Sequence, residues 1–249
     1  MHRIVLLIAM MGLLIFPFIS QADQSGDIIK RVEDNLNGET AVMDINMVVK
    51  TKRAERTMKM TSYSIGNEKS FIKILYPRKD KGITFLKIDN TMWQYVPRIE
   101  KTIKIPASMM LQSWMGSDFS NDDLVKESSI SNDYTQKLLS ETDEVFVIEL
   151  WPKEEAAVVW GKIIMEVSKQ YYLPTTVLYY DEDELLIREL VYSDVQPFGE
   201  RFYPTRWVMT PQEEEKAGHE TKMEISNAVF DEPVAESYFT KRALKRYSR

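Results

Sequence analysis

The feature that most constrains this fold is a long series of short segments in which apolar and polar side chains alternate. Residues 41–49 show the pattern clearly, because every second side chain is apolar and Asp44 and Asn46 lie between them. A period of two is typical of a strand with one buried face. The segments span residues 41–49, 57–61, 71–76, 83–88, 92–96, 99–105, 145–150, 159–167, 171–180, 185–195, 202–210 and 221–230. Eleven or twelve strands at hairpin spacing predict a mainly β (α+β) protein, with one meandering antiparallel sheet that curls at this size.

Only a few short helices are predicted. Residues 25–37 are predicted to form one helix, because their apolar side chains recur on one helical face, and Gly38 is expected to end it. A second helix is predicted over residues 106–115, because Pro106 is well tolerated in a first turn. Residues 236–246 are expected to form a short helix or turn that Phe239 and Leu244 anchor. Since so few helices cannot cover both faces of a large curved sheet, we expect them to plug its concave side.

The N-terminus has the three parts of a secretory signal peptide. Arg3 supplies the positive charge, residues 4–16 are apolar, and Ser20 and Ala22 are the small residues that a signal peptidase recognises. We therefore expect cleavage after Ala22, which leaves residues 23–249 as a single periplasmic domain; an uncleaved anchor is the alternative. The chain has no cysteine, so neither disulfides nor a cysteine-linked lipid anchor are expected.

Composition argues against several classes of function. The formal net charge is −6, whereas non-specific nucleic-acid binding requires a basic face. One of the two histidines is His2 in the predicted signal peptide, and His219 lies in a predicted turn without a nearby catalytic or metal-binding partner. The acidic clusters at residues 122–123, 181–184 and 213–215 also fall in predicted turns and are interpreted as solvated loops. The sequence thus predicts a protein that is not an enzyme and has no cofactor or metal.

Methionine is abundant, and eleven of the fourteen methionines follow residue 22. Methionine side chains adapt to irregular apolar partners, which suits a surface that binds variable ligands. If the first two strands pair, Met43 and Met47 share a face with Met58 and Met60. Ordinary core packing is the alternative to an apolar ligand cavity. The residues expected to line the cavity or its lid are Met43, Met47, Met58, Met60, Phe85, Met92, Trp93, Tyr95, Met109, Met110, Leu111, Trp114 and Met115.

A polar turn, Gly116-Ser117-Asp118-Phe119-Ser120, follows this apolar segment. Asp118 or Ser120 is expected to cap the next turn, and Phe119 to anchor it by packing. Gly116 and Pro106 are plausible hinge ends for a lid that moves when cargo enters. Basic residues gather in residues 50–59 and 241–249, either as solvated charge or as docking sites for anionic headgroups or an acidic protein.

The chain resembles the LolA-like family of outer-membrane lipoprotein-sorting proteins. The most specific part of the resemblance is residues 115–124, which read Met-Gly-Ser-Asp-Phe-Ser-Asn-Asp-Asp-Leu. Shorter motifs occur in the same order along the chain, at residues 76–77, 82–86, 92–97, 173–174, 179–181, 192–195 and 238–240.

The resemblance implies an incomplete, strongly curved antiparallel β barrel of about eleven strands, with short helices as a lid over its hydrophobic concave face. It implies a periplasmic carrier that shields acyl chains of lipoproteins or other lipids between the two membranes. Its partners would be an inner-membrane transporter of the ABC or RND type and an outer-membrane acceptor. The family motif would be Gly116, Ser117, Asp118 and Phe119. Two alternatives stay open: a periplasmic adaptor that binds no lipid, and an enzyme that acts on a lipid or envelope polymer.

Overall fold

The computed structural model describes residues 21–126, 130–156 and 158–249. Residues 1–20 of the predicted signal peptide lie outside this part, so the cleavage site stays a prediction. No helix in the described ranges is long and apolar enough to cross a bilayer.

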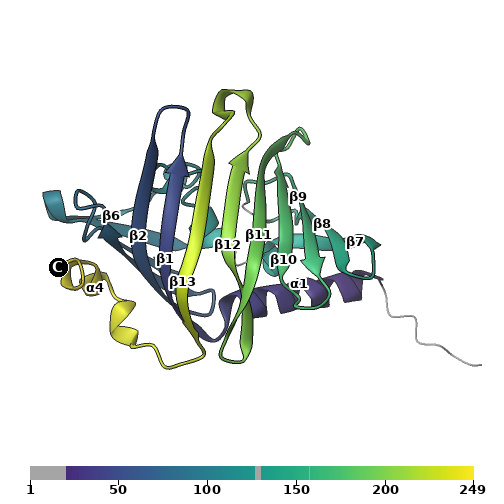
Figure 1. Ribbon diagram of the computed structural model, residues 1–249, viewed down its shortest axis with the longest axis horizontal. Helices are drawn as coiled ribbons and strands as arrows, with labels where there is room; N and C mark the ends of the chain where they lie inside the picture. The colour runs from purple at the N-terminus through teal and green to yellow at the C-terminus, as the bar shows by residue number, and fades with distance from the viewer. Residues whose placement is uncertain (1–20, 127–129, 157) are drawn as a thin grey trace, which may run out of the picture.

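One antiparallel sheet of thirteen strands dominates the molecule, in the order β6-β5-β4-β3-β2-β1-β13-β12-β11-β10-β9-β8-β7 (Figure 1). The strands are β1 Thr40–Lys50, β2 Glu55–Ile65, β3 Lys69–Tyr76, β4 Thr84–Ile88, β5 Thr91–Val96, β6 Lys101–Lys104, β7 Tyr134–Glu141, β8 Val145–Pro152, β9 Lys162–Ser168, β10 Pro174–Tyr180, β11 Leu186–Phe198, β12 Arg201–Pro211 and β13 Glu220–Phe230. Strands β6 and β7 are the two edges, so the sheet is curved but not closed. The predicted meander is confirmed.

The structure has more strands than the expected eleven or so. The strand that the sequence pattern missed is β7, Tyr134–Glu141, which was interpreted as a polar connection. Only Tyr134 of this strand is buried, and the residues after it are half-buried or exposed. An edge strand with both faces largely in solvent carries no alternating apolar pattern, so its sequence gives little signal.

The apolar rows on the inner face follow from strand register. Met47 of β1 lies opposite Met58 of β2, as predicted, and opposite Met223 of β13 on its other side. Trp207 of β12 lies opposite Met223, and Tyr192 of β11 lies opposite Trp207. Side chains directly opposite one another share a face of the sheet. A continuous row of methionine and aromatic side chains therefore crosses the middle of the inner face.

Helix α1, Gln21–Asn37, covers part of this inner face. Its buried side chains Ile28, Ile29 and Val32 belong to the main apolar cluster, together with residues of strands in both halves of the sheet. The helix ends as predicted at Gly38, which has a φ of +64°. A Cβ atom there would lie 2.9 Å from Asp231 Oδ1, so glycine meets both a conformational and a spatial need.

The C-terminal segment lies on the outer face of the sheet, which differs from the expectation that all helices plug the concave side. Helix α4, Lys241–Arg246, follows the turn η6, Glu236–Tyr238, and contacts β4 and β5 (Figure 1). The predicted anchors are confirmed, since Phe239 and Leu244 are buried there. The physical reason is that this half of the sheet carries apolar side chains on both faces, including Phe71, Leu86 and Tyr95 on the outer one.

Candidate functional site

The connecting segment, residues 105–133, joins the edge strand β6 to the opposite edge strand β7 and lies over the inner face. It contains the short helical turns η2 Ala107–Met109, η3 Trp114–Gly116, α2 Asp123–Lys126 and α3 Ile130–Asp133. Its side chains Trp114, Phe119 and Ile130 are buried in the main apolar cluster. The turns η1 Pro97–Ile99 and η5 Glu214–Lys216 lie outside it, as does η6.

The prediction of one helix over residues 106–115 was wrong. The amide of Asn121 donates hydrogen bonds to the carbonyl oxygens of Met109 at 2.9 Å and Gln112 at 3.3 Å. Met115 has a φ of +51°, a left-handed conformation that a helix does not tolerate. Polar contacts from the following turn thus satisfy the backbone in place of helical hydrogen bonds.

The family motif forms a compact loop within the connecting segment. The Trp114 N–H donates to the Phe119 carbonyl oxygen at 2.7 Å, which closes the loop. The Ser117 hydroxyl donates to the Trp114 carbonyl at 2.7 Å and accepts from the Phe119 N–H at 3.2 Å. Ser120 caps helix α2, because its hydroxyl accepts from the Asp123 N–H at 3.2 Å. Phe119, at 2% exposure, is the packing anchor that the sequence suggested.

A few polar contacts fasten this loop to the sheet. The Asp118 N–H donates to the Thr221 hydroxyl oxygen at 2.9 Å, and that hydroxyl donates to the Asp118 carboxylate at 2.6 Å. Arg56 of β2 donates to the carbonyl oxygen of Met115. Asp118 thus contacts strand β13 instead of capping a turn.

The strongest of these contacts is a buried ion pair between Asp123 and Arg188 of β11. The side chains are 4% and 6% exposed, and Arg188 Nη1 lies 2.6 Å from Asp123 Oδ2. The guanidinium lies 4.3 Å from the ring centroids of both Trp160 and Tyr179. Asp122 and Asp123 are buried, so the interpretation of residues 122–123 as a solvated loop was wrong.

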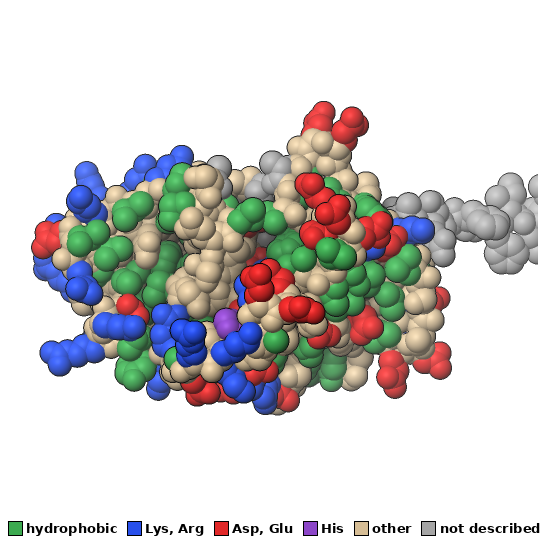
Figure 2. Space-filling model, turned by 90° about the horizontal axis from the view of Figure 1, so that it is seen from above, with side chains coloured by type: hydrophobic (Ala, Val, Ile, Leu, Met, Phe, Trp, Pro, Cys, Tyr) green, Lys and Arg blue, Asp and Glu red, His purple; other side chains and the backbone are tan. Residues whose placement is uncertain are grey.

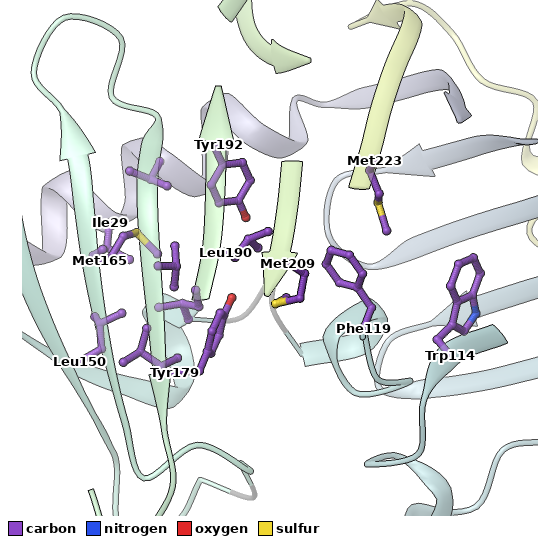
Figure 3. Close-up of a cluster of buried hydrophobic side chains, with 14 of the residues drawn as sticks. Ile29, Trp114, Phe119, Leu150, Met165, Tyr179, Leu190, Tyr192, Met209 and Met223 are labelled. Carbon is purple, nitrogen blue, oxygen red and sulfur yellow. The ribbon is translucent and has the colours of Figure 1, made fainter. Parts of the chain in front are cut away.

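A cavity of about 240 Å³ lies between α1, the inner face of the sheet and the connecting segment. We call it cavity 1. Its apolar wall comes from all three elements: Ile29, Val32, Leu36, Met43, Ile45, Met60, Ile72, Trp114, Phe119, Leu124, Ile130, Met165, Tyr192, Tyr203, Trp207 and Met223. Figure 3 shows Phe119 between Trp114 and the sheet residue Met209, with Met223 above it.

A second cavity of about 410 Å³, cavity 2, lies on the other side of the loop. Its wall includes Leu111, Ser117, Asp118, Arg188 and His219. Figure 2 shows His219 on the face seen from above, with basic and acidic side chains around it. Phe119 lines both cavities, so its ring is part of the wall that separates them.

The structure brings most of the residues expected for a cavity or lid onto the inner side. Three of them line cavity 1: Met43, Met60 and Trp114. Another four are buried in the main cluster beside it: Met47, Met58, Phe85 and Met92. Three more are partly buried against the cluster: Met109, Met110 and Met115. Gly116, with a φ of +70°, lies next to Arg56.

Three expected residues lie elsewhere. Trp93 and Tyr95 point to the outer face and pack in the cluster under α4, where Lys241 lies 4.7 Å from the Trp93 ring centroid. Leu111 is 62% exposed. Trp93 follows Met92 directly in a strand, and adjacent strand residues face opposite sides, so the two cannot line one cavity.

Sequence reasoning did not select several residues of the wall, among them Ile29, Val32 and Leu36 of α1 and Tyr192 and Trp207 of the sheet. The apolar stripe of residues 25–37 was a usable signal for the helical ones. Polar groups also line cavity 1. Burial raises the pKa of Glu33, and hydrogen bonds from Ser131 act in the opposite direction.

We expect Asp118→Ala to lower the free energy of unfolding by about 1 kcal/mol, the net contribution of a typical hydrogen bond. The substitution removes the acceptor of the Thr221 hydroxyl and leaves the Asp118 N–H bond in place. Urea denaturation measures the change. Asp183→Ala, in an exposed turn, is the control, and an equal loss in both variants would contradict a fastening role for Asp118.

Three solved structures share this fold. A DUF1329 family protein from Desulfovibrio piger superposes with a TM-score of 0.83 at 21% identity, over 90% of this chain and 99% of that one. A protein domain from Vibrio parahaemolyticus named for outer membrane lipoprotein sorting gives 0.79 at 22% identity, over 90% and 100% of the chains. A LolA superfamily protein from Nitrosomonas europaea gives 0.73 at 20% identity, over 88% and 98%.

A family model described as an uncharacterized protein matches residues 66–246, which is more than half of the chain. The chain belongs to the family that this model describes, and it shares its fold with the LolA superfamily protein. The match includes the connecting segment and every strand from β3 onward. No curated protein sequence matches the chain.

The described part of the chain holds no cluster of three or more His, Cys, Asp or Glu side chains suited to a metal ion. The chemistry available in cavity 1 is apolar contact with a few polar groups at its wall, which suits non-covalent binding of an apolar molecule.

Proposed function

We propose that this protein is a periplasmic carrier that shields the acyl chains of lipoproteins or other lipids in cavity 1. The observation that carries the proposal is a partly open apolar cavity between α1, the inner face of the sheet and the connecting segment. The fold shared with a LolA superfamily protein and with a domain named for lipoprotein sorting supports the same assignment.

The energetics favour such a cargo. An acyl chain exposed to water costs about 0.8 kcal/mol for each methylene, so shielding ten methylenes stabilises the complex by several kcal/mol. Cavity 1, at about 240 Å³, is below the range of roughly 300–1,000 Å³ typical of ligand pockets. A long chain therefore enters only when the connecting segment moves away from the sheet.

The polar contacts of the loop fit this movement. The Asp118–Thr221 hydrogen bonds and the contact of Arg56 with the Met115 carbonyl oxygen can break and form again at low net cost. Cargo would be loaded by an inner-membrane transporter of the ABC or RND type and delivered to an outer-membrane acceptor, after export and cleavage behind Ala22.

Native mass spectrometry of protein purified from its periplasm, with lipid extraction of the same sample, tests the proposal. A co-purifying lipid or lipoprotein is the expected result. A ligand-free mass that stays unchanged after incubation with acylated peptides and phospholipids would indicate the adaptor function instead.

We expect that locking the loop to the sheet abolishes cargo uptake. The chain has no native cysteine, so Asp118→Cys with Thr221→Cys allows one specific disulfide between these contacting positions under oxidising conditions. If loop displacement limits entry, uptake of an apolar fluorescent probe should fall by more than about tenfold.

A matched control is the pair Lys137→Cys and Glu149→Cys, which lie opposite one another on the neighbouring strands β7 and β8, outside the connecting segment. The control crosslink should leave uptake unchanged. Full uptake by protein crosslinked between positions 118 and 221 would contradict loop movement as the route of entry.

A further inference from the structure

The wall of cavity 1 contains two tryptophans with different hydrogen bonding. Trp207 Nε1 donates to the Pro204 carbonyl oxygen at 2.8 Å. Trp114 is 1% exposed, and its Nε1 is buried with no hydrogen-bond partner among the residues that the structure describes. A buried indole N–H usually has a partner, because leaving a polar group unpaired in an apolar environment is unfavourable. Because Trp114 lines cavity 1, an acceptor on a molecule bound there would satisfy this donor.

The wall next to Trp114 is polar as well as apolar. The Trp114 ring lies 5.2 Å from the ring of Phe85, centroid to centroid. Phe85 and Lys87 are two residues apart in β4, so both project from the inner face. Lys87 is 5% exposed, and its ammonium donates to the Asn67 carbonyl oxygen at 2.6 Å.

Two hydroxyl side chains continue this polar wall. Ser70 of β3 lies opposite both Ser64 of β2 and Lys87 of β4, and all three line cavity 1. On the α1 side the cavity is lined by the apolar Ile29, Val32 and Leu36 and by the polar Glu33 and Asn37. The cavity thus offers polar groups to an acceptor-bearing group and a larger apolar wall to a hydrocarbon chain.

We propose that Trp114 Nε1 donates a hydrogen bond to a carbonyl oxygen of the bound acyl group, which makes cavity 1 selective for acyl esters, amides or carboxylates over plain hydrocarbons. This inference rests on the proposed carrier function and names the part of the cargo that the cavity recognises. The carbonyl end lies against the β4 wall, and the alkyl chain extends toward α1. Trp114 is a specificity-determining residue in this arrangement.

Two fluorescent polyene probes separate the effect of the hydrogen bond from the effect of apolar packing. The methyl ester of cis-parinaric acid carries a carbonyl oxygen, whereas diphenylhexatriene is a hydrocarbon without any acceptor. Trp114→Phe keeps an aromatic ring and removes the donor. We expect its dissociation constant for the ester to rise about 2- to 12-fold, the equivalent of one net hydrogen bond. Binding of diphenylhexatriene should stay within a factor of about two.

Trp207→Phe is the matched control, because it removes an indole that lines the same cavity but whose N–H is already satisfied. It should change the affinities for both probes by the same factor. A second measurement uses the indole N–H signals of the five tryptophans in an NMR spectrum. The signal that Trp114→Phe removes should shift with the ester and stay in place with the hydrocarbon.

The possible failures are distinguishable. If wild-type protein binds both probes and Trp114→Phe weakens both equally, or weakens neither, the hydrogen bond is contradicted and the carrier function stands. If wild-type protein binds neither probe, the carrier function is contradicted and this inference with it.

Discussion

Arg188→Met is expected to lower the free energy of unfolding by about 3–5 kcal/mol, because it leaves the Asp123 carboxylate buried without its counter-ion. Arg188 and Asp123 are 6% and 4% exposed, so water cannot compensate for the lost partner. The substitution also removes the guanidinium that lies against Trp160 and Tyr179. Methionine retains much of the length and apolar surface of arginine. The loss of unfolding free energy therefore comes mainly from removal of the positive charge.

A double-mutant cycle tests this explanation. The double variant Arg188→Met with Asp123→Asn removes both charges of the pair, and we expect it to be more stable than the sum of the single changes by about 1–3 kcal/mol. Lys216→Met serves as the control, because it breaks an exposed pair with Glu213 that is worth less than about 1 kcal/mol. Urea denaturation of the four variants and the wild type gives the energies. Additive losses would mean that the ion pair does not fasten the connecting segment.

Phe119→Ala is expected to lower the free energy of unfolding by about 3–5 kcal/mol, the usual cost of truncating a buried phenylalanine. The ring is 2% exposed. Because Phe119 lines both cavities, its loss should also connect spaces of about 240 and 410 Å³. The variant should then favour long over short acyl chains more strongly than the wild type does.

Leu111→Ala is the matched control in the same connecting segment, because Leu111 is 62% exposed and its truncation removes little packing. Urea denaturation measures stability, and competition between acyl chains of different length measures selectivity. A large loss of stability with unchanged chain-length preference would show that Phe119 packs the loop without dividing the cavities.

The sheet was largely predictable from the sequence, whereas the connecting segment was not. Alternation in a strand such as residues 41–49 is a local property, and it correctly indicated that Met47 faces Met58. Strand β7 lacked this signal because it is an exposed edge. The predicted helix over residues 106–115 failed because the amide of Asn121, farther along the chain, satisfies its carbonyl oxygens.

The candidate functional site was likewise predictable only where local sequence patterns determine it. The clustering of methionines correctly indicated the inner face of the sheet. The ion pair of Asp123 with Arg188 could not be predicted, because it joins residues far apart in the chain and no local sequence pattern indicates it. Strand β5 has apolar side chains on both faces, with Met92 on the inner one, so composition alone could not assign Trp93 and Tyr95 to the outer cluster. Once the strand register is known, it assigns both side chains to the outer face of the sheet.

The pairing of β1, Thr40–Lys50, with β13, Glu220–Phe230, has a consequence for how the protein is made. Strand β2 can pair with β1 and strands β3 to β6 can extend the sheet early, because they follow β1 directly in the chain. The other edge of β1 stays unpaired until the last strand has been made, and pairing over such a distance is slow. During that interval an apolar strand in the middle of the future sheet is an open edge, the kind of surface that pairs with other chains. Newly made copies therefore need protection from one another until residues 220–230 are available, and a chain truncated before them keeps that edge permanently open.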